Sequence, residues 1–354
     1  MTDAHVVILH ANPGADAGPL TKAVGAARAA LAERHRERFT RAGATSVRIL
    51  AGPPDDVAFG ARLRAIARGL GRGGLVVLGS GAVPLLRAAD ASRFLAVAAR
   101  DERVALANNR YLADIVAVAR ASEVLGGLPD LATDNALPRW LAEKAGVDVS
   151  DLRSRWRLGV DIDSPLDLVL LGPRFTRQLA LDDRKVVEGR LEAVRAIASD
   201  PRAELLVAGR TSPAALGWLG RAAAARTRAF VEERGLRTSL PGQRPPASVL
   251  GLLLDRDGPT ALALHLPRLA DAALVDTRVL LAHRLGPDER AWPSAEDRFA
   301  SDLLAPEAIT DPWLRALTQA ALAAPIPIVL GGHTLVGPGV RLALGGAHRR
   351  AGQA

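Results

Sequence analysis

The sequence contains no cysteine, one methionine, one tyrosine and only three lysines among its 354 residues. The absence of cysteine excludes a disulfide framework, a thiolate nucleophile and a zinc site with thiolate ligands. Chemistry must therefore come from carboxylate, imidazole, hydroxyl or backbone groups. The opening residues show no basic segment before an apolar core, and no apolar run reaches membrane-spanning length without a charge, proline or glycine. These absences predict a soluble, cytoplasmic protein that does not act in a membrane.

The positive charge of the chain is spread rather than gathered. The formal net charge is +8 and the pI about 10.9, and the basic residues, nearly all arginine, alternate with carboxylates along most of the expected helices. One tyrosine and six phenylalanines supply little surface on which bases could stack. The pattern argues against nucleic acid as a partner and favours an anionic small molecule, such as a nucleotide. It gives no indication of the oligomeric state.

Short apolar runs alternate with helical patterns in the first half of the chain. Apolar residues recur at helical spacing over residues 20–43 and 55–70, with glycine at or just past the end of each segment. Buried strands are expected over residues 5–11, 46–52, 74–81 and 103–108. This alternation predicts an α/β fold with a mostly parallel sheet and helices on both faces.

A second cycle begins after a helical stretch at residues 182–200. Strands are expected over residues 203–210 and 248–255, and helices over residues 213–235 and, as one long helix or a pair, 259–286. A first domain is therefore expected over residues 1–180 and an α/β or mainly helical domain over 181–345. Residues 239–247, rich in proline and glycine, are expected to form a loop, and residues 346–354 a flexible tail.

The stretch WRLGVDIDSPLDLVLL, residues 156–171, holds the most informative pair of carboxylates. Asp161 and Asp163 are two residues apart, so on an extended segment both side chains point the same way and can bind one cation. A second interpretation is local: either aspartate can cap a helix that begins at Ser164 and Pro165.

The order of motifs in the first half resembles the Rossmann-like nucleotidyltransferases, especially the guanylyltransferases of molybdenum-cofactor and phospholactate biosynthesis. The resemblance spans roughly residues 5–170. It rests on a first strand with a glycine-containing loop, on the lysine of GPLTKAV, and on GGLVVLGSGAVPLL, ANNRYLADIVAVA and GVDIDSPLDL. It implies an enzyme that transfers a nucleotidyl group from a nucleoside triphosphate to a phosphorylated small molecule.

The resemblance also implies roles for individual residues. Asp161 and Asp163 would hold Mg²⁺, and Lys22 would neutralise the nucleotide phosphates. The remaining nucleotide-binding candidates are Gly14, Gly18, Asn108 and Asn109. Two simpler interpretations stay open: Lys22 as an ordinary surface lysine, and the two asparagines as turn residues.

Two departures from the family pattern bear on activity. The position two before Pro84 is Ala82, where the family has a metal-binding carboxylate. The first loop, HANPGADAGPLTK, lacks the family's paired glycines and the arginine that follows them. The metal site is thus incomplete by the family's standard, so the alternative is a catalytically degenerate protein that binds a nucleotide or nucleotide-sugar, or serves as a scaffold.

Polar residues in the second half suggest another site. His333 follows an apolar run and two glycines, where it could serve as an acid or base beside an anion-binding turn. The other members of this predicted second site are Arg210, Asp276, Arg278 and Asp297. Local ion pairs and a partly buried, hydrogen-bonded histidine are the simpler alternative.

Overall fold

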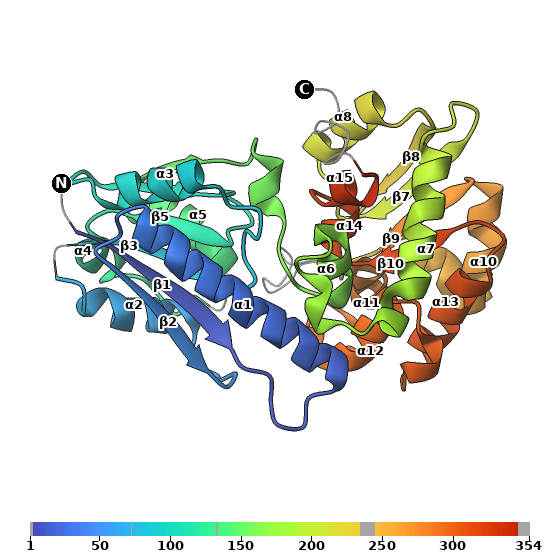
Figure 1. Cartoon of the computed structure of the whole chain (residues 1–354), viewed down its shortest axis with the longest axis horizontal. Helices are drawn as coiled ribbons and strands as arrows, with labels where there is room; N and C mark the ends of the chain where they lie inside the picture. Colours follow the sequence, from blue (N-terminus) through green and yellow to red (C-terminus); the bar gives the residue numbers. More distant parts are fainter. Residues whose placement is uncertain (1–2, 72, 132–133, 234–244, 346–354) are drawn as a thin grey trace. The chain divides into compact units, whose positions relative to one another are not determined.

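A computed structural model describes residues 3–71, 73–131, 134–233 and 245–345, which form two compact units (Figure 1). The first unit comprises residues 1–17 and 25–162, and the second comprises residues 18–24 and 163–354. The expected tail at 346–354 and most of the expected loop at 239–247 lie outside the described residues. None of the described helices is both long and apolar enough to cross a membrane.

A six-stranded mixed sheet forms the centre of the first unit. Its strands are β1 (Ala4–Ala11), β2 (Ser46–Gly52), β3 (Gly74–Gly79), β4 (Val104–Ala107), β5 (Ile115–Val118) and β6 (Asp148–Asp151). They lie in the order β2-β1-β3-β5-β4-β6, and β5 runs antiparallel to both of its neighbours. The remaining pairs are parallel. Together with the second sheet, which is parallel throughout, this confirms the predicted α/β class.

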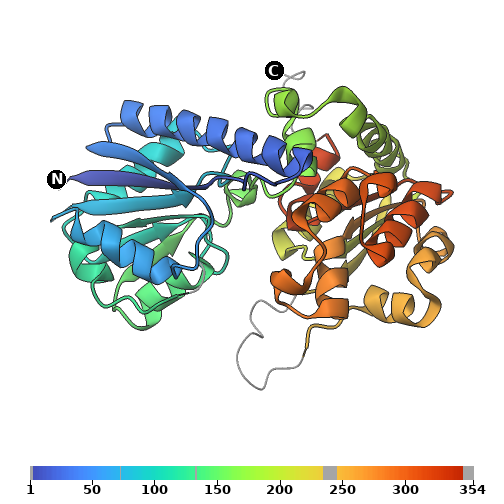
Figure 2. The same ribbon diagram turned by 90° about the horizontal axis from the view of Figure 1, so that it is seen from below.

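Helices cover both faces of this sheet, as Figure 2 shows. They are α1 (Pro19–Arg41), α2 (Phe59–Arg68), α3 (Ala88–Ala98), α4 (Ala121–Leu125) and α5 (Leu137–Glu143). Because strand side chains alternate, Val6 packs with Phe94 of α3 on one face while Val7 packs with Leu63 of α2 on the other. Continuous apolar runs are expected when both faces of a strand are buried.

A four-stranded parallel sheet forms the centre of the second unit. Its strands are β7 (Glu204–Gly209), β8 (Arg226–Val231), β9 (Ala272–Asp276) and β10 (Ile328–Gly331), in the order β10-β9-β7-β8. The helices are α6 (Pro165–Leu171), α7 (Leu181–Ala198), α8 (Pro213–Ala222), α9 (Val249–Asp257), α10 (Leu262–His265), α11 (Thr277–Leu285), α12 (Ala295–Asp302), α13 (Pro312–Ala323), α14 (His333–Val336) and α15 (Val340–Ala343). Short 3-10 helices lie at Asp134–Ala136 and Trp156–Gly159 in the first unit. In the second unit they lie at Thr176–Gln178, Pro259–Ala261, Leu266–Arg268, Glu289–Ala291 and Pro306–Ala308.

Three elements expected in the second half are wrong. Residues 248–255, expected as a strand, begin helix α9, where the Ser248 hydroxyl accepts a hydrogen bond from the backbone N–H of Gly251. The expected helix at 213–235 ends at Ala222 and is followed by strand β8. The expected helices at 259–286 enclose strand β9, which is buried throughout. Short apolar runs do not separate helix from strand by periodicity, and tertiary burial decided these cases.

The strand order creates a switch point between β7 and β9. The chain leaves β7 for β8 on one side, and it later returns to β9 on the other side. In open α/β sheets, ligands bind beyond the carboxyl ends of the strands at such a point. In this unit those ends carry Arg210 after β7, Asp276 in β9, and His333 after β10.

Candidate functional site

Asp161 is fixed to the loop that follows β3. It forms an isolated antiparallel bridge with Ala82, and the next residue, Ile162, donates its N–H to the carbonyl oxygen of Gly81 at 2.9 Å. The Nε of Arg28 in α1 donates to the carbonyl oxygen of Ile162 at 2.6 Å. The Asp161 side chain is buried, at 9% relative exposure, whereas Asp163 is exposed.

Asp167 caps the start of α6. Its Oδ2 accepts the backbone N–H groups of Asp163 at 2.8 Å and of Ser164 at 2.7 Å, while Pro165 occupies the first helical turn. Asp167 was not among the residues predicted from the sequence, although the spacing of Ser164 and Asp167 is that of a capping box. Asp167, the third acidic residue of the motif, therefore accepts the N–H groups at the start of α6. The local interpretation had given this capping role to Asp161 or Asp163.

His333 lies at the start of α14, directly after β10 and Gly332, and is half-buried. The Thr277 hydroxyl donates to the carbonyl oxygen of Gly331 at 3.2 Å, and the carbonyl oxygen of His333 accepts the N–H of Gly337 at 2.7 Å. These bonds fix the backbone on both sides of the imidazole.

Asp163 and His333, both in the second unit, each offer one ligand atom, and the two atoms lie within 4.8 Å of each other. The proximity of the two aspartates is a local property of the chain, since only Ile162 separates them. Two carboxylate oxygens and one imidazole nitrogen form a donor set that can hold a divalent cation. The two aspartates were predicted from the sequence as metal ligands, whereas His333 was predicted as an acid or base of another site.

Three residues of the predicted second site lie in one buried network. Arg210 donates from Nε to Asp276 Oδ2 at 2.6 Å and from Nη2 to Oδ1 at 3.1 Å. The backbone N–H of Arg278 donates to Asp276 Oδ1 at 3.1 Å, and its guanidinium forms a bidentate pair with Asp302. Asp302, which sequence analysis did not select, is fully buried. Arg278 and Asp302 are 24 positions apart in the chain, so no local sequence pattern reveals this pair.

The charges in the network compensate one another. Burial alone would raise the pKa of Asp276, but Arg210, Arg278 and His333 reverse this effect and lower it overall. Burial opposes the charge of Arg278, yet Asp302 and Asp276 raise the pKa of the guanidinium. A bidentate arginine–carboxylate geometry offsets part of the desolvation that such buried charges cost.

Asp297 makes a different set of contacts. Its carboxylate accepts the N–H of Thr310 at 3.0 Å and of Asp311 at 2.8 Å, and its own N–H donates to the capping hydroxyl of Ser294 at 3.0 Å. It thus holds the turn before α13 to the start of α12, and none of its hydrogen bonds reaches Arg210, Asp276 or Arg278 within the described part of the chain.

Glu296 occupies the N-terminus of α1. Its carboxylate accepts the N–H of Leu20 at 2.9 Å, and both the N–H and the hydroxyl of Thr21, at 3.0 and 2.8 Å. A Cβ on Gly18 would lie 2.3 Å from Glu296 Cδ, so a side chain there would push the Glu296 carboxylate aside, whereas a Cβ on Gly14 would meet open space. Lys22 is exposed. A phosphate bound to this first turn would have to displace the carboxylate, and the roles of Gly14, Gly18 and Lys22 stay predictions.

The two asparagines have structural partners. Asn108 is buried; its Nδ2 donates to Asp114 Oδ2 and to the carbonyl oxygen of Leu158, both at 2.7 Å, and its Oδ1 accepts the N–H of Asp114 at 2.9 Å. Asn109 Oδ1 accepts the N–H of Tyr111 at 2.9 Å. Both amides therefore stabilise the connection between β4 and β5, and contact with a nucleotide stays a prediction.

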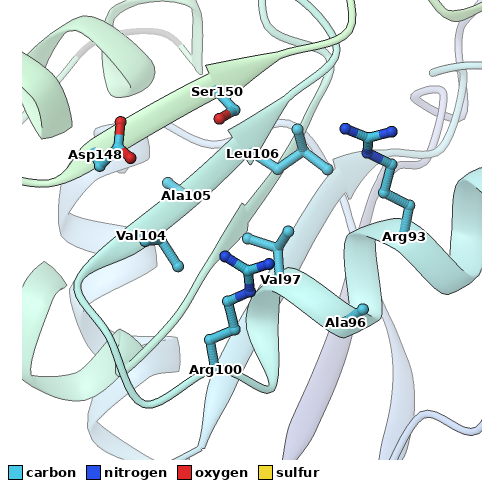
Figure 3. Close-up of a pocket in the computed structure, with 9 residues that line it drawn as sticks. All are labelled: Arg93, Ala96, Val97, Arg100, Val104, Ala105, Leu106, Asp148 and Ser150. Atoms are coloured by element: carbon cyan, nitrogen blue, oxygen red, sulfur yellow. The ribbon is translucent and has the colours of Figure 1, made fainter.

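A surface groove of the first unit lies between α3 and strands β4 and β6 (Figure 3). Val97, Val104 and Leu106 supply apolar walls; Arg93 extends from α3, and Arg100 lies two residues past the end of this helix. None of the residues predicted for a site lines this groove.

Comparison with known proteins finds weak likeness to a few solved structures. No protein family matches the chain, and no curated protein does. Among solved structures, a protein described as a nucleotide-diphospho-sugar transferase from Desulfovibrio desulfuricans G20 is 17% identical over 51% of this chain and 90% of its own, with a TM-score of 0.34.

Proposed function

We propose that the protein is a metal-dependent, nucleotidyltransferase-like enzyme that transfers a nucleotidyl group from a nucleoside triphosphate to a phosphorylated small molecule. The observation that supports this most directly is that the ligand atoms of Asp163 and His333 lie within 4.8 Å of each other in the second unit, with Asp161 only two positions from Asp163 in the chain. In such a reaction, a phosphate oxygen of the acceptor forms a bond to the α-phosphorus as the bond to pyrophosphate breaks. Positioning and charge neutralisation supply most of the catalysis.

Some residues would hold the cation, and others fix the backbone that carries its ligands. Asp161, Asp163 and His333 would hold the cation, which, when bound, would neutralise the phosphate oxygens. Gly81 and Arg28 fix the backbone next to Asp161, and Asp167 fixes the backbone at Asp163. Lys22, on the exposed side of α1, would supply further positive charge to the nucleotide phosphates.

The donor set indicates which ion is preferred. Mg²⁺ takes oxygen ligands almost exclusively, whereas an imidazole suits the first-row transition ions. With one nitrogen among three protein ligands, we expect Mn²⁺ to bind more tightly than Mg²⁺. Replacing His333 with glutamine should remove most of that preference.

Pyrophosphate release tests the proposed activity. The full chain would be incubated with each nucleoside triphosphate and a set of phosphorylated acceptors, with Mn²⁺, Mg²⁺ or chelator. Metal-dependent release that Asp161→Asn and Asp163→Asn both abolish would support the proposal. Asp200→Asn is the matched control, because the described residues pair the Asp200 side chain with neighbouring Arg202 on the surface of the second unit. If both site variants release pyrophosphate at the wild-type rate, the proposal is contradicted.

Ala82 supports the alternative of a degenerate binding protein. This residue replaces the carboxylate that the resemblance implies, and it lies opposite Asp161. A protein of this kind would bind a nucleoside triphosphate or a nucleotide-sugar in the presence of metal without releasing pyrophosphate. Equilibrium binding measured beside the release assay separates the two functions.

A further inference from the structure

The turn between β7 and α8 holds a hydroxyl that lacks a partner. Thr211 donates its backbone N–H to the carbonyl oxygen of Gly209 at 2.8 Å, and Gly209 has a φ of 132°. The next residue, Ser212, uses its hydroxyl to cap α8 by accepting the N–H of Ala215 at 3.2 Å. The hydroxyl oxygen of Thr211 is shielded from solvent, yet it has no hydrogen-bond partner in the described structure. A buried polar atom of this kind needs an explanation, and a ligand oxygen is one.

Arg210 precedes this threonine and is held in a fixed orientation. Asp276, whose side chain is fully buried, pairs with Nε and Nη2 of the guanidinium, and the Arg210 side chain keeps 18% of its exposure. The pair with Asp276 uses Nε and Nη2 of Arg210, so the third guanidinium nitrogen, Nη1, lies outside it. A guanidinium fixed from behind by a carboxylate is pre-organised to bind an oxyanion, because little side-chain entropy remains to be lost.

The turn that carries His333 packs against this one. A Cβ added to Gly337 would lie 2.7 Å from the carbonyl oxygen of His333 and 3.4 Å from that of Arg210. Asp276 also interacts electrostatically with both Arg210 and His333. Arg210, Thr211 and His333 thus lie together at the switch point between β7 and β9, where open α/β sheets bind ligands.

We infer that the β7–α8 turn binds a phosphate group, with Arg210 as the cationic donor and the Thr211 hydroxyl as the neutral donor. Phosphate accepts hydrogen bonds from several directions and forms paired bonds with guanidinium, which suits donors on consecutive residues. The identification of this phosphate with the substrate of the transfer reaction rests on the proposed function. Binding of phosphate itself does not.

The surrounding charges predict how binding depends on metal. Arg210 and Arg278 are balanced by Asp276 and Asp302, so the network attracts a dianion weakly by net charge alone. A cation held by Asp163 and His333 would add the missing positive charge. Metal and phosphate should therefore each raise the affinity of the other by the same factor.

Titration of the full chain with inorganic phosphate tests the site. Calorimetry in chelator measures phosphate binding without metal, and a second series contains Mn²⁺. Thr211→Val removes only the hydroxyl, and we expect it to weaken phosphate about tenfold in both series, while Arg210→Lys, which loses the paired geometry, should weaken it more. The matched controls are Thr227→Val, which removes another buried hydroxyl without a partner, and Arg228→Lys, which alters an arginine paired with Glu204.

Thermal unfolding separates binding from a structural role. Because the Thr211 hydroxyl has no partner, Thr211→Val should leave the melting temperature without phosphate unchanged or raised, and it should reduce the gain that phosphate produces. Equal phosphate affinity in wild type and Thr211→Val would overturn the inference, as would absence of phosphate binding by wild type. If Thr211-dependent binding persists in chelator while Asp163→Asn has no effect on binding in Mn²⁺, the phosphate site stands and the proposed metal function fails.

Discussion

Ala82 lies directly opposite Asp161 in an isolated antiparallel bridge. Side chains of directly opposed residues in such a bridge leave the backbone on the same side, with Cβ atoms about 4.5 to 5.5 Å apart. The position at which the resembled family carries a metal-binding carboxylate is therefore adjacent to Asp161 in space. Its replacement by alanine removes one oxygen ligand and one negative charge from the immediate surroundings of Asp161.

Restoring this carboxylate should strengthen metal binding. We expect Ala82→Asp to tighten Mg²⁺ about tenfold and to reduce the advantage of Mn²⁺, because an added oxygen ligand favours the harder ion. Isothermal titration with each ion measures both effects. Ala82→Asn is the control for size and polarity at this buried position, and equal affinities for the Asp and Asn variants would show that position 82 does not reach the ion.

The acidic residues of the GVDIDSPLDL motif should separate by function. Asp167→Ala leaves the N–H groups of Asp163 and Ser164 without their acceptor, so we expect the free energy of unfolding of the second unit to fall by about 1 to 2 kcal/mol. Asp161→Asn keeps the size and one oxygen acceptor of this buried side chain, so we expect it to cost less stability than Asp167→Ala and to weaken metal binding strongly. Chemical denaturation and metal titration of both variants measure this contrast. A larger loss of stability in Asp161→Asn than in Asp167→Ala would argue for a purely local structural role of Asp161.

Removal of Glu296 should expose a new anion site at the start of α1. Glu296→Ala frees the N–H groups of Leu20 and Thr21, and we expect a loss of about 1 to 2 kcal/mol in the free energy of unfolding. Because a helix N-terminus attracts anions, phosphate should stabilise this variant more than wild type. Melting temperatures over a phosphate series measure this difference, with exposed Glu307→Ala as the control. An equal phosphate effect in all three proteins would indicate that the first loop does not form a phosphate site.

The elements predicted from sequence are those whose signal is local. Strands β1, β2 and β3 were predicted close to their observed bounds and lie in one sheet, because each is an apolar run flanked by clear turns or helices. Strand β9 was hidden inside a longer apolar segment, and α9 is rich in leucine, which both helices and buried strands contain. Their assignment depends on tertiary burial.

In the candidate site, too, relationships between neighbouring residues were predicted and those between distant residues were not. Two aspartates separated by one residue predicted a shared ligand position from their local spacing, and this stays a prediction. The proximity of His333 to Asp163 joins residues about 170 positions apart. The pairing of Arg210 with Asp276 likewise depends on the order of β7 and β9 in the sheet. Neither relationship has a sequence period that could reveal it.

His35 should make the stability of the first unit depend on pH. Burial lowers the pKa of His35 from 6.5 to about 4, assisted by the charges of Arg38 and Arg34 and opposed by the hydrogen bond with Ala82. The neutral imidazole donates from Nε2 to the carbonyl oxygen of Ala82 at 2.9 Å, because a carbonyl can only accept. The unfolded chain therefore binds a proton more readily than the folded chain between pH 6.5 and about 4.

The sign of the effect follows from this difference in proton binding. The contribution of His35 to stability is fully present above pH 6.5 and is lost as the pH falls toward about 4, a change on the order of 3 kcal/mol. Urea denaturation at pH 5.0 and 7.5, with hydrogen exchange of amides in the first unit as the readout, measures this change in the free energy of unfolding. His35→Gln keeps a donor for Ala82 but does not titrate, so it should flatten the pH dependence. An unchanged slope in this variant would mean that another group, and not His35, controls the acid sensitivity of the first unit.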